Sequence, residues 1–277
     1  MTLSHEAFEY VASLVRQQAA IMLEPGKEYL VESRLTPLAA KAGHGSLDAY
    51  IAAVRASPGR ETEAIVDALT TNETSWFRDA TPFTALTDIA VPNLRARRGH
   101  LTRLNVWSAA CSTGQEPYSI AMTLQDKEPA LAVNVLATDL SRTVLERAQA
   151  GRYNQLEVNR GLPASSLVKH FTRDGADWTL SDEVRRSVRF AQHNLLLPPP
   201  PGGPFDVVFL RNVLIYFDIP TKKAVLGRVR EALTPDGYLF LGAAETTVGI
   251  DDGWERVTAG RTFIYCPTPT TPKGVAT

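Results

Sequence analysis

An alternation of strand-like and helix-like segments, which begins after Ala90, constrains the fold of this chain more than any other feature. The apolar run LNVWSA is followed by a helical pattern from about Glu116, and VNVLATD by another from Thr143 to Ala150. The alternation resumes with FDVVFLRN, a helical stretch from Pro220 to Leu233 and the strand-like YLFLGAA. Such alternation is typical of a parallel sheet covered by helices. Residues 91–267 are therefore predicted to form an α/β domain of the nucleotide-binding type.

The first 70 residues show a helical pattern instead. Phe8, Val11, Leu14 and Val15 fall on one face of a helix, and the same spacing returns from residue 30 to 38. Breaks that contain glycine or proline divide the region into three or four short helices. Residues 1–70 are thus predicted to form a small all-α domain, joined to the α/β domain by residues 71–90.

Two segments depart from this plan. Between residues 151 and 192 the alternation stops, and Trp178–Leu180 and Val188–Ala191 are short and β-like. We therefore predict a small inserted β-subdomain at about residues 152–191. The last residues, 268–277, are rich in proline and threonine, which predicts a disordered tail.

Composition limits the partners and the compartment. The net charge of −1 and the pI near 6.5 lack the overall signature of a nucleic-acid-binding protein. Cys111 and Cys266 are far apart and have no metal-ligand spacing, so we expect neither a disulfide nor a metal. The sequence shows no signal peptide and no run of roughly 20 apolar residues. We expect a cytoplasmic protein without membrane insertion or a nucleic-acid partner.

The strand LNVWSA leads into small residues that favour a cofactor pocket. Residues 109–114 read AACSTG, which lets the backbone approach a ligand closely before a helix opens at Gln115. Asp139 ends the next strand, roughly 20 residues after this loop. In dinucleotide-binding folds, a carboxylate at this position accepts hydrogen bonds from ribose hydroxyls. Together these features indicate a cofactor that contains adenosine.

The same loop argues against a dinucleotide. It lacks the pattern G-x-G-x-x-G, and Glu116 near the helix start would repel a pyrophosphate. An acid at this position suits a cationic group such as the α-amino group of a methionyl moiety. S-adenosylmethionine is therefore favoured over a nicotinamide, while an NAD-type oxidoreductase and a purely structural α/β domain stay open as alternatives.

Four segments carry a resemblance to a known family. LTTNETSWFRD, VWSAACSTGQEPYSIAM, FDVVFLRNVLIYFD and DGYLFLGAAE resemble, in this order, the signature blocks of chemotaxis receptor glutamate O-methyltransferases of the CheR type. The resemblance covers nearly the whole chain apart from the tail. It implies a Rossmann-like class I methyltransferase domain that moves a methyl group from S-adenosylmethionine to glutamates of methyl-accepting chemotaxis proteins, leaving S-adenosylhomocysteine.

The resemblance also implies the site. Glu116 matches the residue that contacts the methionyl part, Asp139 the ribose ligand, and Asn194 with Leu195 the adenine side. The full implied set of cofactor-binding residues is Asn72, Thr74, Arg78, Glu116, Asp139, Asn194, Leu195, Arg211 and Asn212. Tyr216 matches a residue that the family places near the transferred methyl group, and Arg78 matches one that lines the pocket from the segment joining the two domains. These two are the predicted catalytic residues.

Some residues fit the family less well or have simpler explanations. Gln115 stands where many members have a second acid, and GAAE around Glu245 stands where members often read GHSE. Taken alone, Arg78 is typical of a surface arginine and Tyr216 of a core tyrosine. Cys111 has no neighbouring base in sequence, so it is predicted to pack rather than react.

A glutamate acceptor simplifies the chemistry. Its reference pKa is about 4.3, so the carboxylate is already ionised at neutral pH and methyl transfer needs no general base. Alignment and desolvation are then the expected sources of catalysis. A non-catalytic module that binds S-adenosylmethionine as a sensor or scaffold remains an alternative.

The receptor substrate implied by the resemblance is an acidic coiled-coil bundle, which calls for a basic docking face. Lys27, Arg34 and Lys41 recur every seven residues and predict one stripe on a helix. The alternative is an ordinary solvated face, because three glutamates interleave with them. The segment FTRDGADWTLSDEV lacks the repeated glycines through which some members bind a receptor C-terminal pentapeptide, so independence of that tether is predicted. We expect a monomer.

Overall fold

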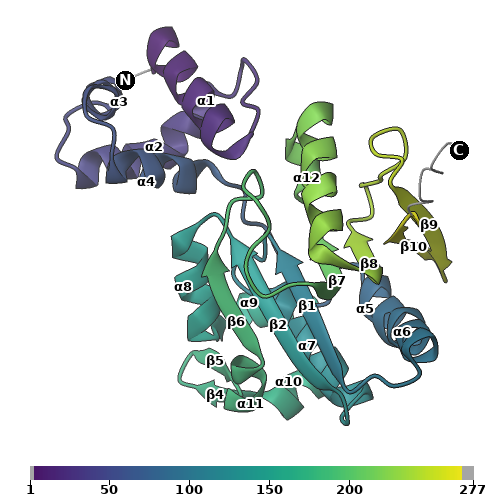
Figure 1. The fold of residues 1–277 in the computed structure, drawn as a ribbon. Coiled ribbons are helices and arrows are strands. Elements are labelled where there is room, and N and C mark those ends of the chain that lie inside the picture. The colour runs from purple at the N-terminus through teal and green to yellow at the C-terminus, as the bar shows by residue number, and fades with distance from the viewer. Residues whose placement is uncertain (1–2, 270–277) are drawn as a thin grey trace, which may run out of the picture.

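The computed structural model describes residues 3–269, so residues 270–277 of the predicted disordered tail lie outside the described part. The chain opens with four helices, which are α1 (His5–Ala19), α2 (Glu28–Lys41), α3 (Leu47–Ala56) and α4 (Arg60–Leu69). Phe8, Val11 and Val15 are buried at the predicted helical spacing, and Ser4 caps α1 by accepting a hydrogen bond from the Ala7 N–H. The predicted all-α domain is confirmed, and Figure 1 shows it at one end of the molecule.

Three short helical elements then lead to the sheet, namely α5 (Thr81–Ala85), the π-helical turn η1 (Leu86–Ala90) and α6 (Val91–Arg98). Residues 70–80, between α4 and α5, form an irregular segment. The connection predicted at 71–90 is therefore part irregular and part helical.

The core of the second domain is a seven-stranded sheet. Its strands are β1 (Arg103–Ala109), β2 (Ala132–Asp139), β6 (Val188–Gln192), β7 (Phe205–Leu210), β8 (Leu233–Leu241), β9 (Trp254–Ala259) and β10 (Thr262–Pro267). The order is β6-β2-β1-β7-β8-β10-β9, with β10 antiparallel to both neighbours and the other pairs parallel. Strand order reverses between β1 and β7, and ligands of such sheets bind at the carboxyl ends of the strands beside that point.

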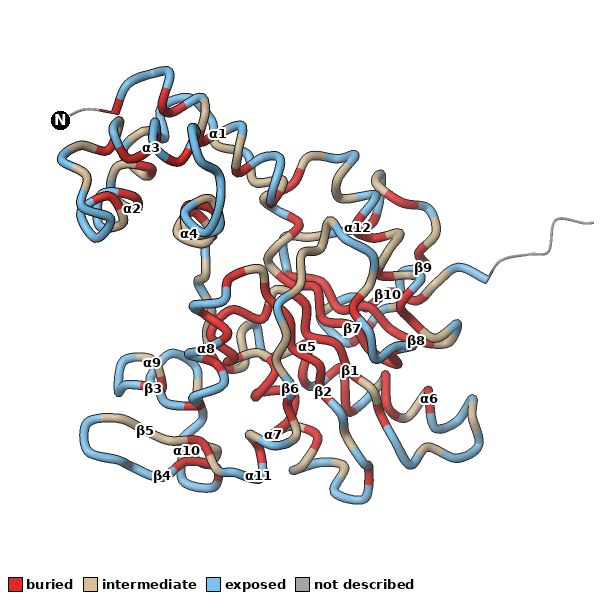
Figure 2. The backbone as a smooth tube through the Cα atoms, turned by 60° about the vertical axis from the view of Figure 1, so that its left-hand side comes forward, coloured by how far each residue is buried: buried red, intermediate tan, exposed pale blue. Residues whose placement is uncertain are grey.

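Helices cover both faces of this sheet, which explains the continuous apolar strands. The remaining helices of this domain are α7 (Gln115–Lys127), α8 (Arg142–Ala150), the 3₁₀ turn η2 (Leu214–Tyr216) and α12 (Ile219–Ala232). Val207 and Phe209 of β7 pack with α5, α6 and α7, whereas Val208 and Leu210 pack with α12. A strand buried on both faces needs apolar residues at every position, and Figure 2 shows the sheet as the main buried part of the backbone.

The insertion forms a separate small sheet of order β3-β5-β4. Its elements are β3 (Arg152–Asn154), α9 (Gln155–Asn159), α10 (Ala164–His170), β4 (Phe171–Asp174), β5 (Asp177–Leu180) and α11 (Asp182–Arg186). The strand expected at Trp178–Leu180 lies in β5. Val188–Ala191, expected within the insertion, instead lies in β6, the edge strand of the large sheet, which pairs in parallel with β2. A short β-like segment does not show which sheet it joins, because that depends on distant strands.

Among residues 3–269, no helix is long and apolar enough to cross a bilayer.

Candidate functional site

One cleft at the carboxyl ends of β1, β2 and β7 brings the predicted site residues together. Its walls include every one of them, which are Asn72, Thr74, Arg78, Glu116, Asp139, Asn194, Leu195, Arg211, Asn212 and Tyr216. They come from the segment after α4, the first turn of α7, the end of β2, the loops after β6 and β7, and η2. The same walls contain Ser112 of the predicted cofactor loop, and also Ala19 and Ile21, which the sequence did not single out.

Asp139 ends β2 and is held in a fixed orientation. It is 7% exposed, its Oδ2 accepts the Ser112 N–H at 2.8 Å, and its Oδ1 accepts the Ser141 N–H at 3.0 Å. Burial raises the pKa of Asp139, and the main-chain N–H groups act in the opposite direction. A carboxylate has further lone pairs beyond these two bonds, so this acid is placed to accept hydroxyl groups of a ribose.

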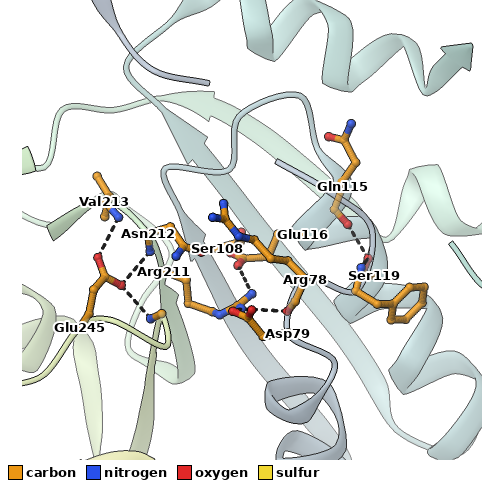
Figure 3. Close-up of polar contacts among 12 residues, drawn as sticks. Arg78, Asp79, Ser108, Gln115, Glu116, Ser119, Arg211, Asn212, Val213 and Glu245 are labelled. Atoms are coloured by element: carbon orange, nitrogen blue, oxygen red, sulfur yellow. Dashed lines mark hydrogen bonds and ion pairs between the residues drawn. The ribbon is translucent and has the colours of Figure 1, made fainter. Parts of the chain in front are cut away.

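Glu116 lies in the first turn of α7 and faces a buried cation. Its side chain is 13% exposed, and its Oε1 accepts a hydrogen bond from Ser108 Oγ at 2.8 Å. Arg211 Nη1 donates to Glu116 Oε2 at 3.0 Å, as Figure 3 shows. Burial raises the pKa of Glu116, while the Arg211 guanidinium and the Ser108 hydroxyl oppose that rise. The negative charge of this buried carboxylate is therefore compensated by the Arg211 guanidinium.

Arg211 makes its contacts with the protein itself. Its side chain is 1% exposed, and Nη2 donates to Asp79 Oδ2 at 2.7 Å and to the Arg78 carbonyl oxygen at 2.8 Å. Its Nε has no hydrogen-bond partner among the described residues. The guanidinium thus joins the end of β7 to α7 through Glu116 and to the segment that carries Arg78, a role that its sequence neighbours did not reveal.

The segment that carries Arg78 has unusual backbone geometry. Phe77, Asp79 and Ala80 have φ angles of 46°, 65° and 47°, in the left-handed region that residues other than glycine rarely adopt. Arg78 itself is half-buried and donates from Nη1 to the Glu73 carbonyl oxygen at 3.3 Å. Such a conformation persists only where surrounding contacts hold it.

Three neighbouring parts of the fold hold this segment. Ser112 Oγ donates to the Asn72 carbonyl oxygen at 2.7 Å, and the Phe77 N–H donates to Ser119 Oγ of α7 at 3.1 Å. The Trp76 N–H donates to the carbonyl oxygen of Arg160, in the insertion, at 3.0 Å. The insertion therefore supports one wall of the cleft.

The all-α domain forms another part of the cleft wall. Asn194 Nδ2 donates to the Gln18 carbonyl oxygen near the end of α1 at 2.7 Å. Ala19 and Ile21 follow in the chain and line the cleft beside Leu195. Nothing in the sequence marks these two apolar residues, because the end of an amphipathic helix looks the same whether or not it meets a second domain.

Three side chains beside the predicted site residues are uncharged, namely those of Gln115, Cys111 and His193. Gln115 is 3% exposed, and its Oε1 accepts a hydrogen bond from Thr113 Oγ1 at 2.8 Å, away from the residues that line the cleft. Burial raises the pKa of the Cys111 thiol well above its usual range, so it stays protonated. Burial lowers the pKa of His193, which favours its neutral form. None of the three is placed as a nucleophile or a charged ligand.

The polar side chains that line the cleft fit S-adenosylmethionine. Asp139 suits a ribose, and Glu116 suits an ammonium group, whereas two acids would repel a pyrophosphate. A sheet of this order with this cleft defines a class I methyltransferase domain, and the model of the CheR methyltransferase SAM-binding domain matches residues 72–264. The model of the CheR methyltransferase all-alpha domain matches residues 6–70.

Two chemotaxis methyltransferases match this chain over almost its full length. The chemotaxis protein methyltransferase Cher2 of Pseudomonas putida is 40% identical over 266 residues, covering 93% of this chain and 96% of the relative. The chemotaxis protein methyltransferase of Vibrio parahaemolyticus is 41% identical over 273 residues, covering 96% and 98%. This chain belongs to the CheR methyltransferase family and is an S-adenosylmethionine-dependent methyltransferase of chemotaxis.

Solved structures match less completely. The glycopeptide N-methyltransferase MtfA is 17% identical with a TM-score of 0.35, covering 56% of this chain and 52% of that chain. The family assignment therefore rests on the family models and the sequence relatives.

Proposed function

We propose that this protein methylates side-chain carboxylates of specific glutamates in the cytoplasmic domain of methyl-accepting chemoreceptors, and that it works in the cytoplasm as a monomer. The products are glutamyl methyl esters, used in chemosensory adaptation, and S-adenosylhomocysteine. The observation that carries the proposal is the convergence of Arg78 and Tyr216 with Glu116 and Asp139 in one cleft. Two of these residues suit the cofactor, and the other two remain for the acceptor.

The proposed step cancels two charges. A carboxylate oxygen of the acceptor forms a bond to the methyl carbon, the carbon–sulfur bond breaks, and its electron pair goes to sulfur. An anion and a sulfonium cation thereby become a neutral ester and a neutral thioether. Because a glutamate is ionised at neutral pH, no base is required. A cleft that aligns oxygen, carbon and sulfur and excludes water favours this reaction.

Arg78 and Tyr216 are proposed to orient the acceptor carboxylate and the sulfonium end. Arg78 is half-buried, and within residues 3–269 its guanidinium makes one side-chain hydrogen bond, to the Glu73 carbonyl oxygen at 3.3 Å. This leaves guanidinium donors for a carboxylate. We expect Arg78→Ala to lower kcat by roughly 100-fold, the scale of a misplaced reactant. Tyr216→Phe should bind S-adenosylmethionine but transfer poorly. Steady-state methylation and calorimetry measure both, and wild-type kcat and affinity in Arg78→Ala would rule out its role.

The direct test of the reaction is transfer from labelled S-adenosylmethionine to a receptor cytoplasmic fragment. Release of the label as methanol in base identifies a carboxyl methyl ester. If the protein binds the cofactor and modifies none of several receptor fragments, the sensor or scaffold function replaces methyl transfer.

Only two of the three basic residues predicted to form a docking stripe on α2 are free of hydrogen bonds with α4 among residues 3–269. Arg34 Nη1 donates to the carbonyl oxygens of Thr70 at 2.7 Å and Ala68 at 3.3 Å, so it satisfies main-chain groups at the end of α4. Lys27 and Lys41 are exposed. The docking proposal therefore rests on these two lysines, while Arg34 has a structural role.

Charge reversal separates the two roles. We expect Lys27→Glu combined with Lys41→Glu to raise KM for the receptor several-fold without changing the thermal midpoint. Arg34→Ala should instead lower stability by about 1 kcal/mol through lost hydrogen bonds. Thermal unfolding and receptor titrations measure these effects. Unchanged methylation by the double lysine variant would exclude docking through this face.

Independence of the receptor C-terminal pentapeptide is also proposed. Strands β4 and β5 pair as far as Asp174 and Asp177, which leaves only Gly175 and Ala176 for the turn. This hairpin has no room for a long glycine-rich loop. We expect no binding of an isolated receptor-tail peptide in calorimetry, and measurable binding heat would contradict the proposal.

A further inference from the structure

Glu245, in the motif GAAE, binds the loop that follows β7. Its Oε2 accepts the N–H groups of Asn212 and Gly242, each at 2.7 Å. Its Oε1 accepts the N–H groups of Val213 at 2.9 Å and Leu214 at 2.7 Å. Figure 3 shows this carboxylate beside Asn212 and Val213. One side chain thus satisfies four main-chain donors and joins the carboxyl ends of β7 and β8.

The loop has a shape that needs an anion. Asn212 has a φ of 60°, in the left-handed region, and the next two N–H groups point to the same carboxylate. Successive N–H groups in such a turn form a concavity that binds negative charge. Gly242 lies against the bound carboxylate, and only a glycine fits there without displacing it. A Cβ at this position would lie 2.7 Å from Glu245 Oε2 and from Asn212 Nδ2.

This loop positions residues of the cleft. Asn212 and Val213 line it, and the turn continues directly into η2, which presents Tyr216 to the same cleft. The Tyr216 N–H donates to the Val213 carbonyl oxygen at 3.2 Å. Glu245 is not among the residues that line the cleft. Its negative charge is a minor cause of the raised pKa of Glu116, and its hydrogen bonds reach the cleft through this loop.

We infer that Glu245 is a positioning residue for methyl transfer, which folds the Asn212–Leu214 turn and so places Asn212 and Tyr216 at the cleft. The part that concerns Tyr216 rests on the proposed function, whereas the part that concerns Asn212 can be measured by binding alone. The inference gives the acid of the GAAE motif a role that its sequence position, 33 residues after Asn212, does not indicate.

The test replaces Glu245 by Gln, which has the same shape but turns an NH₂ group toward donors. We expect Glu245→Gln to weaken S-adenosylhomocysteine binding and to lower kcat, each by roughly tenfold. Glu245→Asp keeps the charge and should recover part of both. If Glu245→Gln does not fold, the same two measurements on Glu245→Asp decide the question.

Asp251→Asn is the matched control. Asp251 is 8% exposed, accepts the Gly253 N–H at 3.0 Å and Arg230 Nη1 at 2.6 Å, and does not line the cleft. It should lose stability but keep kcat and cofactor affinity. Equal kinetic losses in both variants, or wild-type affinity and kcat in Glu245→Gln, would overturn the inference. If the wild-type protein methylated no receptor, the proposed function would fail, while the binding of S-adenosylhomocysteine would still test Glu245.

Discussion

Arg211→Met is expected to abolish S-adenosylmethionine binding and methyl transfer while the chain still folds. Methionine keeps much of the arginine's length but removes its charge and its donors. Glu116, 13% exposed, is then left without its cation, and removing one partner of a buried ion pair costs about 3–5 kcal/mol. The pKa of Glu116 rises further without the guanidinium, which favours the neutral acid over the carboxylate that attracts an ammonium group. Urea unfolding and calorimetric titration with S-adenosylmethionine measure the two losses.

Arg98→Met is the control for this prediction. Arg98 also bridges two acids, with Nη1 2.6 Å from Asp206 Oδ1 and Nη2 2.6 Å from Asp236 Oδ1. Asp206 lies near the start of β7, whereas the cleft lies at the carboxyl ends of the strands. Its loss should lower stability and leave cofactor affinity unchanged in the folded protein. Wild-type affinity in Arg211→Met would show that the buried guanidinium does not organise the site.

Gly161→Ala is expected to weaken cofactor binding from a position in the insertion. Gly161 has a φ of 94°, and a Cβ there would lie 2.3 Å from the Trp76 carbonyl oxygen. The main chain must therefore move, and the hydrogen bond from the Trp76 N–H to Arg160 is strained or lost. Trp76 is 1% exposed and packs edge-on against Tyr153, so its displacement disturbs the segment that carries Asn72 and Arg78. We expect roughly tenfold lower affinity for S-adenosylmethionine, about 1.4 kcal/mol.

Gly175→Ala isolates the clash from the backbone strain. Gly175 also has a left-handed φ, 63°, but nothing lies within 4 Å of a Cβ there. Both variants pay the left-handed cost of roughly 1–2 kcal/mol. Only Gly161→Ala should then lose cofactor affinity, as measured by calorimetry after both thermal midpoints are known. Equal affinities in the two variants would show that the insertion does not support the cleft.

Much of the architecture could be predicted because it depends on local pattern. The strands β1, β2 and β7 and helix α7 follow from runs of apolar residues and small-residue loops, each contained in a few consecutive positions. Asp139 could be placed for the same reason, since it ends a recognisable strand. The motif blocks of the family then placed the other cleft residues, including Tyr216, in one set.

Partners distant in sequence could not be predicted in this way. The heptad spacing of α2 is the same whether Arg34 faces solvent or binds the end of α4. The apolar segment at Val188 reads equally well as part of the insertion or as an edge of the large sheet. Glu245 has nothing nearby in sequence that indicates the loop it binds.

The sequence by itself determined an all-α domain, a parallel sheet with helices, and the residue types of an S-adenosylmethionine cleft, because periodicity and loop composition act over short stretches of chain. Only the tertiary structure decided how these residues are held. Arg211 meets Asp79 from 132 positions away, Asn194 meets Gln18 from 176 positions away, and Glu245 folds the loop before Tyr216. Such contacts depend on where the strands and domains bring the chain together, and that is a property of the packed molecule rather than of any one segment.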